Sequence, residues 1–131
     1  MPHIDKVGLV VIEDRRLLCA RSRGKSLFYI PGGKREAEET DDETLIREIG
    51  EELAVGLIPE TICFIRSFIA QADEKADGMA VSLRCYSADY TGIPKPAAEI
   101  EEIAWLGFED IHRCSRAAAM VMQDAHTRGL I

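Results

Sequence analysis

The sequence predicts an α/β fold in which a mixed β-sheet is covered by helices on both faces. Short apolar segments typical of strands occur in the first third of the chain and again after residue 60. Two helical patterns alternate with them, and this order of strands, helix, strands and helix favours a sheet between helices. The chain of 131 residues is 47% hydrophobic and shows no internal repeat or linker, so we expect one domain, 1–131.

The first third of the chain predicts short strands separated by turns. The run Val7–Ile12 is apolar and β-branched, as a buried strand should be. A turn at Glu13-Asp14 is expected to lead into a second strand, Arg16–Ala20. The segment Leu27–Ile30 is short and extended, and Pro31-Gly32-Gly33 is expected to end it.

The first helix is expected to begin at Thr40. Thr40 and Glu43 have the spacing of a capping box, in which each side chain bonds the backbone of the other residue. An apolar arc of the helix predicts the face that packs on the core: Leu45, Ile46, Ile49 and Leu53. Gly56 and Pro59 are expected to end the helix.

The second half of the chain predicts three strands and a helix. The strands are expected over Thr61–Ala70, Met79–Tyr90 and Ile100–Leu106, and the helix over Glu109–Thr127 with a break near Ser115. A polar loop, QADEKADG, joins the first two of these strands.

Composition narrows the classes of function. The net charge of −7 and the pI near 5.0 argue against broad binding to a nucleic acid polymer or to an anionic membrane. A small phosphate compound stays open, because bound metal ions can reverse the local charge. The four cysteines form no CxxC pair and are expected to be buried thiols in a reducing, cytoplasmic setting. No apolar stretch is long enough to span a membrane or to act as a leader peptide.

An acidic cluster lies on the predicted first helix. Glu48, Glu51 and Glu52 are related as i, i+3 and i+4, so they share an arc of about 100°, separate from the apolar arc. A solvated charged face is the common explanation of such a pattern. The alternative is a site for a divalent cation such as Mg²⁺, which binds oxygen ligands.

The residues around this cluster carry a family resemblance. The segment GKREAEETDDETLIREIGEELAV, which begins at Gly33, resembles the Nudix box G-x5-E-x7-R-E-U-x-E-E-x-G-U, where U is aliphatic. The preceding YIPGGK resembles the strand and turn that usually come before the box. The one departure is Ala54 in place of the last glycine, and we expect the helix to run on to Gly56 as a result. The resemblance implies the Nudix fold, an α/β/α sandwich with a central mixed β-sheet.

The resemblance also implies an activity. Nudix enzymes hydrolyse a nucleoside diphosphate linked to another group X, with Mg²⁺ or Mn²⁺ as cofactor. Carried over position by position, Glu51 and Glu52 look like the main metal ligands, and Glu48 looks like a further ligand or the general base. The carbonyl of Gly32 looks like a backbone ligand.

Further candidates surround these ligands. Arg47 and Glu39 look like the ion pair that orients the loop and the catalytic glutamates. The stretch AEIEEIAW resembles a region where many Nudix proteins carry an extra acid, which makes Glu99, or else Glu102, a candidate metal ligand or base. A solvated loop acid is the competing interpretation.

Substrate contacts are predicted from basic and aromatic residues near the turn. The candidates for phosphate contacts are Arg21, Arg23, Lys25 and Lys34, and those for stacking on a base are Phe28, Tyr29 and Trp105. A solubilising basic loop and ordinary core aromatics are the competing interpretations. No role is assigned to the three histidines.

The identity of X is approached by elimination. Motifs of the ADP-ribose, dinucleoside polyphosphate, NADH and coenzyme A types are absent, which favours a MutT-like (d)NTP pyrophosphohydrolase that gives NMP and pyrophosphate. Hydrolysis of ADP-ribose or a nucleotide sugar is the alternative. A non-catalytic Nudix-fold binding or regulatory module is the alternative of another class, disfavoured by the complete set of carboxylates. Many Nudix proteins are dimers, so a homodimer also stays open.

Overall fold

A computed structural model of the protein describes residues 3–73 and 78–131. Two α-helices, two 3₁₀ helices (η) and nine strands follow one another within these residues: β1 His3–Leu9, β2 Ile12–Glu13, β3 Arg16–Ser22, β4 Gly32–Lys34, α1 Asp41–Leu53, β5 Gly56–Leu57, η1 Pro59–Thr61, β6 Cys63–Gln71, β7 Ala80–Ser87, β8 Tyr90–Thr91, β9 Ile100–Leu106, η2 Phe108–Arg113 and α2 Arg116–Thr127. None of the described helices has the length and apolar character needed to cross a membrane.

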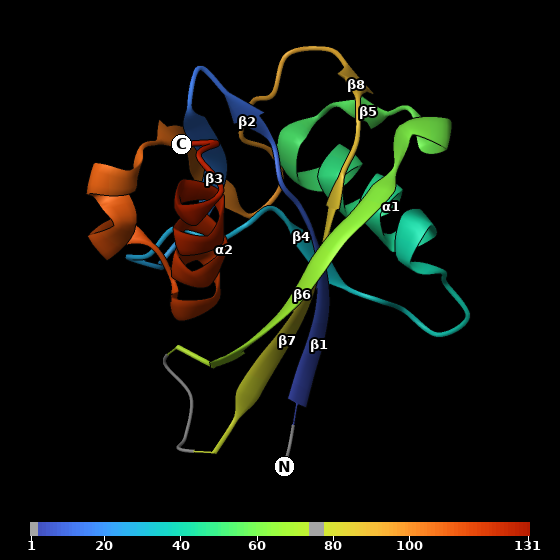
Figure 1. Ribbon diagram of the computed structural model, residues 1–131. Helices are drawn as coiled ribbons and strands as arrows, with labels where there is room; N and C mark the ends of the chain where they lie inside the picture. Colours follow the sequence, from blue (N-terminus) through green and yellow to red (C-terminus); the bar gives the residue numbers. More distant parts are fainter. Residues whose placement is uncertain (1–2, 74–77) are drawn as a thin grey trace.

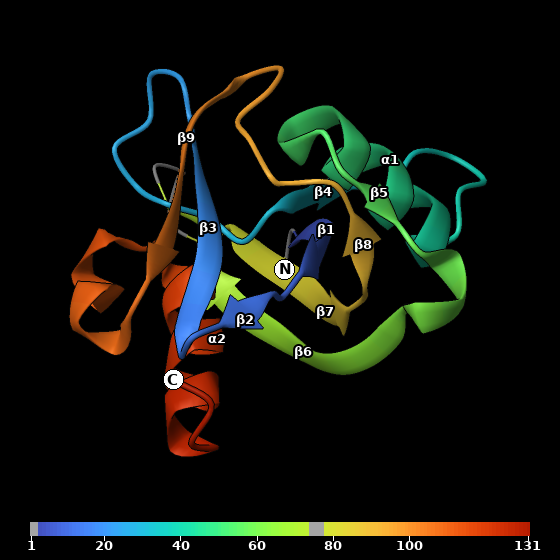
Figure 2. The same cartoon turned by 90° about the horizontal axis from the view of Figure 1, so that it is seen from above.

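The strands form a mixed β layer between the two α-helices. In the described residues the sheet orders are β4-β1-β7-β6, β2-β3-β9 and β5-β8. β1 and β7 run parallel, whereas β4 and β6 are antiparallel to their neighbours. Helix α1 lies on one side of this layer and α2 on the other (Figures 1 and 2). The predicted fold class is therefore confirmed.

Two apolar clusters hold the layers together. On β3 the side chains alternate between them, because successive residues of a strand point to opposite faces. Leu18 belongs to the cluster that contains Leu45, Ile49 and Leu53 of α1. Leu17 and Cys19 belong to the cluster built on α2. Burial on both sides explains why this strand reads as a continuous apolar run rather than as an alternating one.

The N-terminal strands differ from the expected bounds. The predicted strand Val7–Ile12 is divided, because the chain changes partner: Val10 N–H donates to the carbonyl of Tyr86 on β7, and the carbonyl of Val11 accepts from Leu18 on β3. The turn lies at Asp14-Arg15 rather than at Glu13-Asp14. Both turn residues have positive φ, 51° and 62°, which is the backbone of a type I′ hairpin.

Other boundaries also shift. Leu27–Ile30 makes only isolated bridges, at Phe28 and Tyr29, and the glycines that were expected to end it instead begin β4. The segment Thr61–Ala70 yields the end of η1 and then β6, and Met79–Tyr90 yields β7 and the start of β8. Residues 74–77 of the predicted polar loop lie outside the described residues. The break near Ser115 is confirmed, since Ser115 caps α2 after η2.

Cysteine placement agrees with expectation except at one position. The four cysteines are free thiols, and Cys19, Cys85 and Cys114 are buried. Cys63 is exposed, contrary to expectation, because it opens β6 at the edge of its sheet.

Helix α1 begins as predicted and ends earlier than predicted. Thr40 and Glu43 form the capping box. The helix stops at Leu53, and Ala54 takes the left-handed conformation, with φ 57° and ψ 34°. The loop that precedes β9 satisfies the last carbonyls: Lys95 N–H donates to Leu53 and Ala97 N–H donates to Glu52, each at 3.0 Å. These bonds fix the helix end despite the alanine, so the expected extension to Gly56 is wrong.

Ala54→Gly is therefore expected to stabilise the fold. A left-handed backbone costs an L-residue about 1 kcal/mol or more, a penalty that glycine does not have. We expect the free energy of unfolding, measured by urea denaturation, to rise by about 1 kcal/mol. Ala37→Gly is the control, because Ala37 is also exposed but has a negative φ. An equal gain at both positions would contradict this explanation.

A second device anchors the start of α1 to the sheet. The carboxylate of Asp41 accepts two hydrogen bonds from Arg84 of β7, at 2.7 and 3.0 Å, and a third from the hydroxyl of Tyr86. The Arg84 guanidinium holds the pKa of Asp41 below its ordinary value of 3.8. The folded chain therefore binds the ionised form of Asp41 more strongly than the unfolded chain does.

Arg84→Met is expected to lower the free energy of unfolding by about 1–3 kcal/mol at neutral pH. Because the pKa of Asp41 is depressed on folding, this contribution is complete above pH 3.8 and is lost as pH falls through the lower, folded value. Urea denaturation from neutral to acid pH should show the wild type and variant converging. Arg35→Met is the control, since Arg35 lies 3.9 Å from Asp41 and is half-exposed. A pH-independent difference would contradict the assignment to Asp41.

Candidate active site

The turn before α1 is built to receive two glutamates of the helix. Gly32 has φ 148°, and a Cβ there would lie 2.0 Å from the carbonyl oxygen of Val7. A Cβ on Gly33 would lie 2.2 Å from Oε2 of Glu48. Gly32 is therefore required for the close approach of β4 to β1, whereas a side chain at Gly33 would displace the carboxylate of Glu48. The approach lets Gly32 N–H donate to Oε1 of Glu52 at 3.1 Å.

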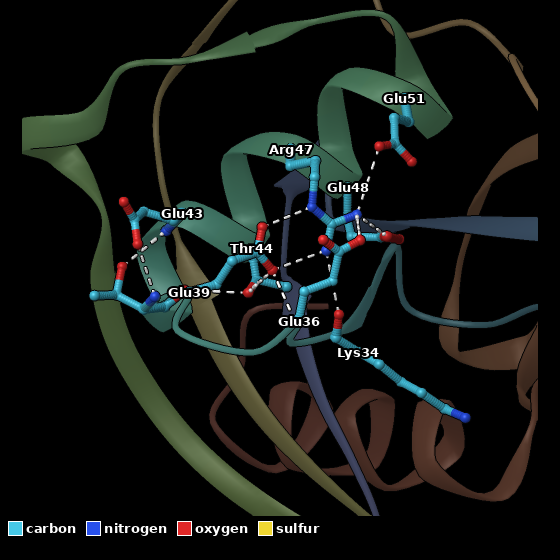
Figure 3. A network of polar contacts seen from close by, with 9 residues as sticks. Lys34, Glu36, Glu39, Glu43, Thr44, Arg47, Glu48 and Glu51 are labelled. Atoms are coloured by element: carbon cyan, nitrogen blue, oxygen red, sulfur yellow. Dashed lines mark hydrogen bonds and ion pairs between the residues drawn. The ribbon is translucent and has the colours of Figure 1, made fainter.

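Arg47 organises the loop that joins β4 to α1 (Figure 3). Its Nε and one terminal nitrogen donate to the two oxygens of Glu39 at 2.7 and 2.9 Å, a bidentate pair. The same carboxylate accepts from Thr44 Oγ1 and from the backbone N–H of Glu36. The structure therefore brings the predicted pair Arg47–Glu39 together and fixes it within the loop.

The remaining side of Arg47 faces the acidic cluster. Its second terminal nitrogen donates to Oε1 of Glu48 at 2.7 Å and lies 3.5 Å from Oε1 of Glu51. Glu48 is nearly buried, whereas Glu51 is about half exposed. Arg47 thus connects the loop carboxylate to two of the three clustered glutamates, as the dashed lines in Figure 3 show.

The carboxyl groups of the site differ in the direction in which their pKa values are shifted. The Arg47 guanidinium lowers the pKa of Glu39 to about 2. Burial raises the pKa of Glu52 to about 8, against the opposing hydrogen bond from Gly32, and Glu48 and Glu99 raise it further. Burial also raises the pKa of Glu48, although Arg47 opposes it. For Glu52 and for Glu48, burial therefore outweighs the contacts that favour the ionised carboxylate, although Glu48 has Arg47 beside it.

These two glutamates open onto a cavity of about 390 Å³. Glu99 also lines it, together with Lys6, Lys25, Lys34 and Tyr29. Apolar side chains of β7 and small side chains of α2 also line it, together with Asp73, which follows β6, and Ser115, which caps α2. Acidic, basic and apolar walls in one cavity suit a ligand that is anionic at one end and apolar at the other.

The donor set fits a divalent cation. Glu48, Glu51, Glu52 and the carbonyl of Gly32 are oxygen donors of the kind that Mg²⁺ and Mn²⁺ prefer, and buried Glu52 lacks a full counter-charge. In residues 3–73 and 78–131 no three His, Cys, Asp or Glu side chains converge closely enough to hold an ion as they stand. This agrees with the hydrogen bond that draws Glu48 toward Arg47. A bound cation would compete with Arg47 for this carboxylate.

Several residues predicted to contact substrate lie elsewhere. Arg21 is paired with Glu101 and Glu102 at 3.0 and 3.1 Å, so Glu102 is engaged outside the cavity. Arg23 donates to the carbonyl of Ala98 at 2.7 Å. Arg21 therefore connects β3 to β9, Arg23 holds the loop that carries Glu99, and neither arginine lines the cavity.

The aromatic candidates divide in a similar way. Phe28 is buried in the cluster on the α2 side, and Trp105 packs against the cluster on the α1 side. Neither of these two side chains lines the cavity, so a stacking role for them stays a prediction that this arrangement does not favour. Tyr29 does line the cavity.

Sequence reasoning missed one basic residue of the site. Lys6 lies on β1, far from the box in sequence, and lines the cavity beside Lys34. The pairing of β1 with β4 brings it there, and no local motif marks this pairing. Ser22, Asp73 and Ser115 also line the cavity, and they were missed because they come from other segments that only the fold brings to it.

A mixed sheet between two helices, with clustered glutamates of one helix at a cavity that also holds lysines, is the arrangement of the Nudix pyrophosphohydrolases. A model of the NUDIX domain matches residues 2–126, and the chain belongs to this family. Family membership together with the complete carboxylate set makes the protein an enzyme of the pyrophosphohydrolase class.

Individual relatives are distant. A MutT-like protein of Streptomyces ambofaciens is 24% identical over 123 residues, which cover 93% of this chain and 75% of the relative. The crystal structure of a MutT Nudix hydrolase from Burkholderia pseudomallei is similar with a TM-score of 0.75, 21% identity, and coverage of 95% and 98% of the two chains. A bifunctional NMN adenylyltransferase/ADP ribose pyrophosphatase from Francisella tularensis, complexed with AMP and a Mn ion, has a TM-score of 0.69 at 20% identity. The match covers 97% of this chain and 42% of the Francisella chain. At these identities the two structures show the fold alone.

Proposed function

We propose that the protein is a Mg²⁺- or Mn²⁺-dependent pyrophosphohydrolase of nucleoside triphosphates, (d)NTPs, that releases NMP and pyrophosphate. The observation that carries the proposal is the meeting of Glu48 and Glu52 with three lysines in one cavity. A triphosphate with its cation needs both signs of charge, since carboxylates hold the cation and lysines balance the remaining phosphate charge. The MutT-like relative supports the MutT-like subgroup, which the sequence resemblance associates with (d)NTPs.

The proposed reaction divides the work among the residues of the site. Attack of water on a phosphorus atom forms one O–P bond, breaks one P–O anhydride bond and transfers a proton to a base. When bound, a divalent cation supplies positive charge that offsets the phosphates and makes the attacking water more acidic. Glu51, Glu52 and the Gly32 carbonyl would hold it, and Glu48 would serve as a further ligand or as the base. Glu99 at the cavity is a second candidate for the base.

Arg47 and Glu39 are proposed to act as positioning residues. The bidentate bond fixes the guanidinium, and the guanidinium in turn fixes Glu48. In this way the loop before α1 determines where the glutamates point without touching the substrate.

Hydrolysis of ADP-ribose or a nucleotide sugar is the second candidate. The fold shared with part of the bifunctional Francisella protein, which is named as an ADP ribose pyrophosphatase as well as an adenylyltransferase, favours keeping it. The reaction and its residues would be the same, and only the product beside NMP would change.

The proposed setting and partners follow from the same features. A small nucleotide is the partner that the cavity suits. The four free thiols, three of them buried, support a reducing, cytoplasmic compartment. A homodimer stays an expectation.

A product assay tests the proposal. The purified protein with Mg²⁺ or Mn²⁺ is incubated with (d)NTPs, 8-oxo-dGTP, ADP-ribose, nucleotide sugars and dinucleoside polyphosphates, and the products are separated by ion exchange. NMP and pyrophosphate from a triphosphate are the expected products. NMP with a phosphorylated sugar would instead establish the second candidate. No turnover on the whole panel would contradict both.

A further inference from the structure

Lys6 and Lys34 are direct neighbours on antiparallel strands. Lys6 of β1 is the register partner of Lys34 of β4, and both side chains line the cavity that Glu48 and Glu52 enter. Register partners in an antiparallel pair have Cβ atoms about 4.5–5.5 Å apart on the same face of the sheet. Two lysine side chains therefore begin next to each other on one face of the sheet, and both line the cavity.

Two opposed lysines repel each other, and an anion that contacts both would offset this repulsion. Like charges directly opposite on a sheet destabilise it. Lys6 is nevertheless held in place: it is partly buried, and its ammonium lies 5.6 Å from the centre of the Tyr29 ring. The position is set by a strand rather than by a loop, which is typical of a group that must hold its ligand at a fixed place.

Glu52 is a competing partner for Lys6, since the Lys6 charge favours ionised Glu52. The charge of one lysine does not offset the effect of burial, which is the largest cause of the raised pKa of Glu52. A cation held by Glu52 would take over the same task and leave the lysine pair facing the phosphates. The two roles differ in what they predict: a partner of Glu52 affects every substrate alike, whereas a phosphate ligand affects the phosphate-rich end alone.

We propose that Lys6, together with Lys34, binds the phosphates that leave as pyrophosphate, and so selects a nucleoside triphosphate over a nucleoside diphosphate joined to a neutral group. This inference rests on the proposed function and names the residue behind its substrate class. In this proposal Lys6 selects substrates whose X group is anionic.

Binding of the two products tests the inference separately from turnover. Dissociation constants for inorganic pyrophosphate and for NMP are measured by calorimetry on the wild type and on Lys6→Met, Lys6→Arg and Lys95→Met. Lys95 is exposed and lies outside the cavity wall, which makes it the matched control. We expect Lys6→Met to weaken pyrophosphate binding about 10- to 100-fold with little change for NMP, the arginine variant to restore it, and the control to change neither.

The outcomes are distinct. Equal weakening of both products, or a fall in kcat with unchanged pyrophosphate affinity, would mean that Lys6 acts through Glu52 or the fold and would overturn the inference. Wild-type enzyme that hydrolyses no triphosphate would overturn the proposed function, whatever the pyrophosphate measurements gave.

Discussion

Glu52→Gln is expected to abolish nearly all hydrolysis while leaving the fold intact. Glu52 is buried, accepts the N–H of Gly32, and presents the least compensated carboxylate of the site. The amide keeps the shape and an acceptor for Gly32 but cannot hold a cation as a carboxylate does. We expect kcat to fall about 10²- to 10⁴-fold, the range for losing a catalytic acid–base or cation-holding group.

Thermal unfolding separates this effect from misfolding. In the presence of a chelator the variant should unfold at a temperature no lower than the wild type, because a neutral amide is easier to bury than an unbalanced carboxylate. Mg²⁺ or Mn²⁺ should raise the unfolding temperature of the wild type and not of the variant, since a ligand stabilises only the protein that binds it. Glu60→Gln, on the exposed surface of η1, is the control and should match the wild type. Retained activity in Glu52→Gln would contradict the assigned role of Glu52.

The helix and its acids were predictable because the information is local. The capping box of Thr40 and Glu43 and the spacing of Glu48, Glu51 and Glu52 depend only on helical geometry over a few residues. The position of Glu39 relative to Arg47 was available from the spacing of the Nudix box. A helix with clear periodicity and a capping signal can therefore be predicted together with the side chains on its exposed face.

The parts that were missed depend on contacts between distant segments. Lys6 lies at the site because β1 pairs with β4. Arg21 lies away from it because its guanidinium pairs with Glu101 and Glu102 of β9. The helix end at Ala54 is imposed by hydrogen bonds from residues 95 and 97. Phe28 lies in the core and Trp105 packs against it because of such distant contacts. Sequence spacing identifies which groups are present, whereas strand pairing decides which of them meet.

Arg47→Lys is expected to lower kcat about 10- to 100-fold although it keeps the positive charge. The guanidinium makes the bidentate bond to Glu39 and, on its other side, the 2.7 Å bond to Glu48. Lysine is a compact ammonium without this planar fork, so it cannot hold both carboxylates in their present positions. Losses of this size are typical when a group that orients metal ligands is removed.

A second arginine supplies the matched control. Arg84 also makes a bidentate bond, to Asp41 at the start of α1, but it does not line the cavity. Arg84→Lys should lower the free energy of unfolding and leave kcat near the wild-type value. Comparing the two variants therefore separates the loss of an arginine fork from the loss of catalytic geometry.

The kinetics and the metal dependence decide what Arg47 does. A positioning residue should change kcat and the metal concentration needed for half-maximal rate, with a smaller effect on KM, because it orients the glutamates and does not touch the nucleotide. Glu39→Gln should show the same pattern, since it breaks the same bond from the other side. A change in KM alone would mean that Arg47 contacts the substrate directly. Equal losses of kcat in Arg47→Lys and Arg84→Lys would mean that helix stability, and not the orientation of Glu48, limits the reaction.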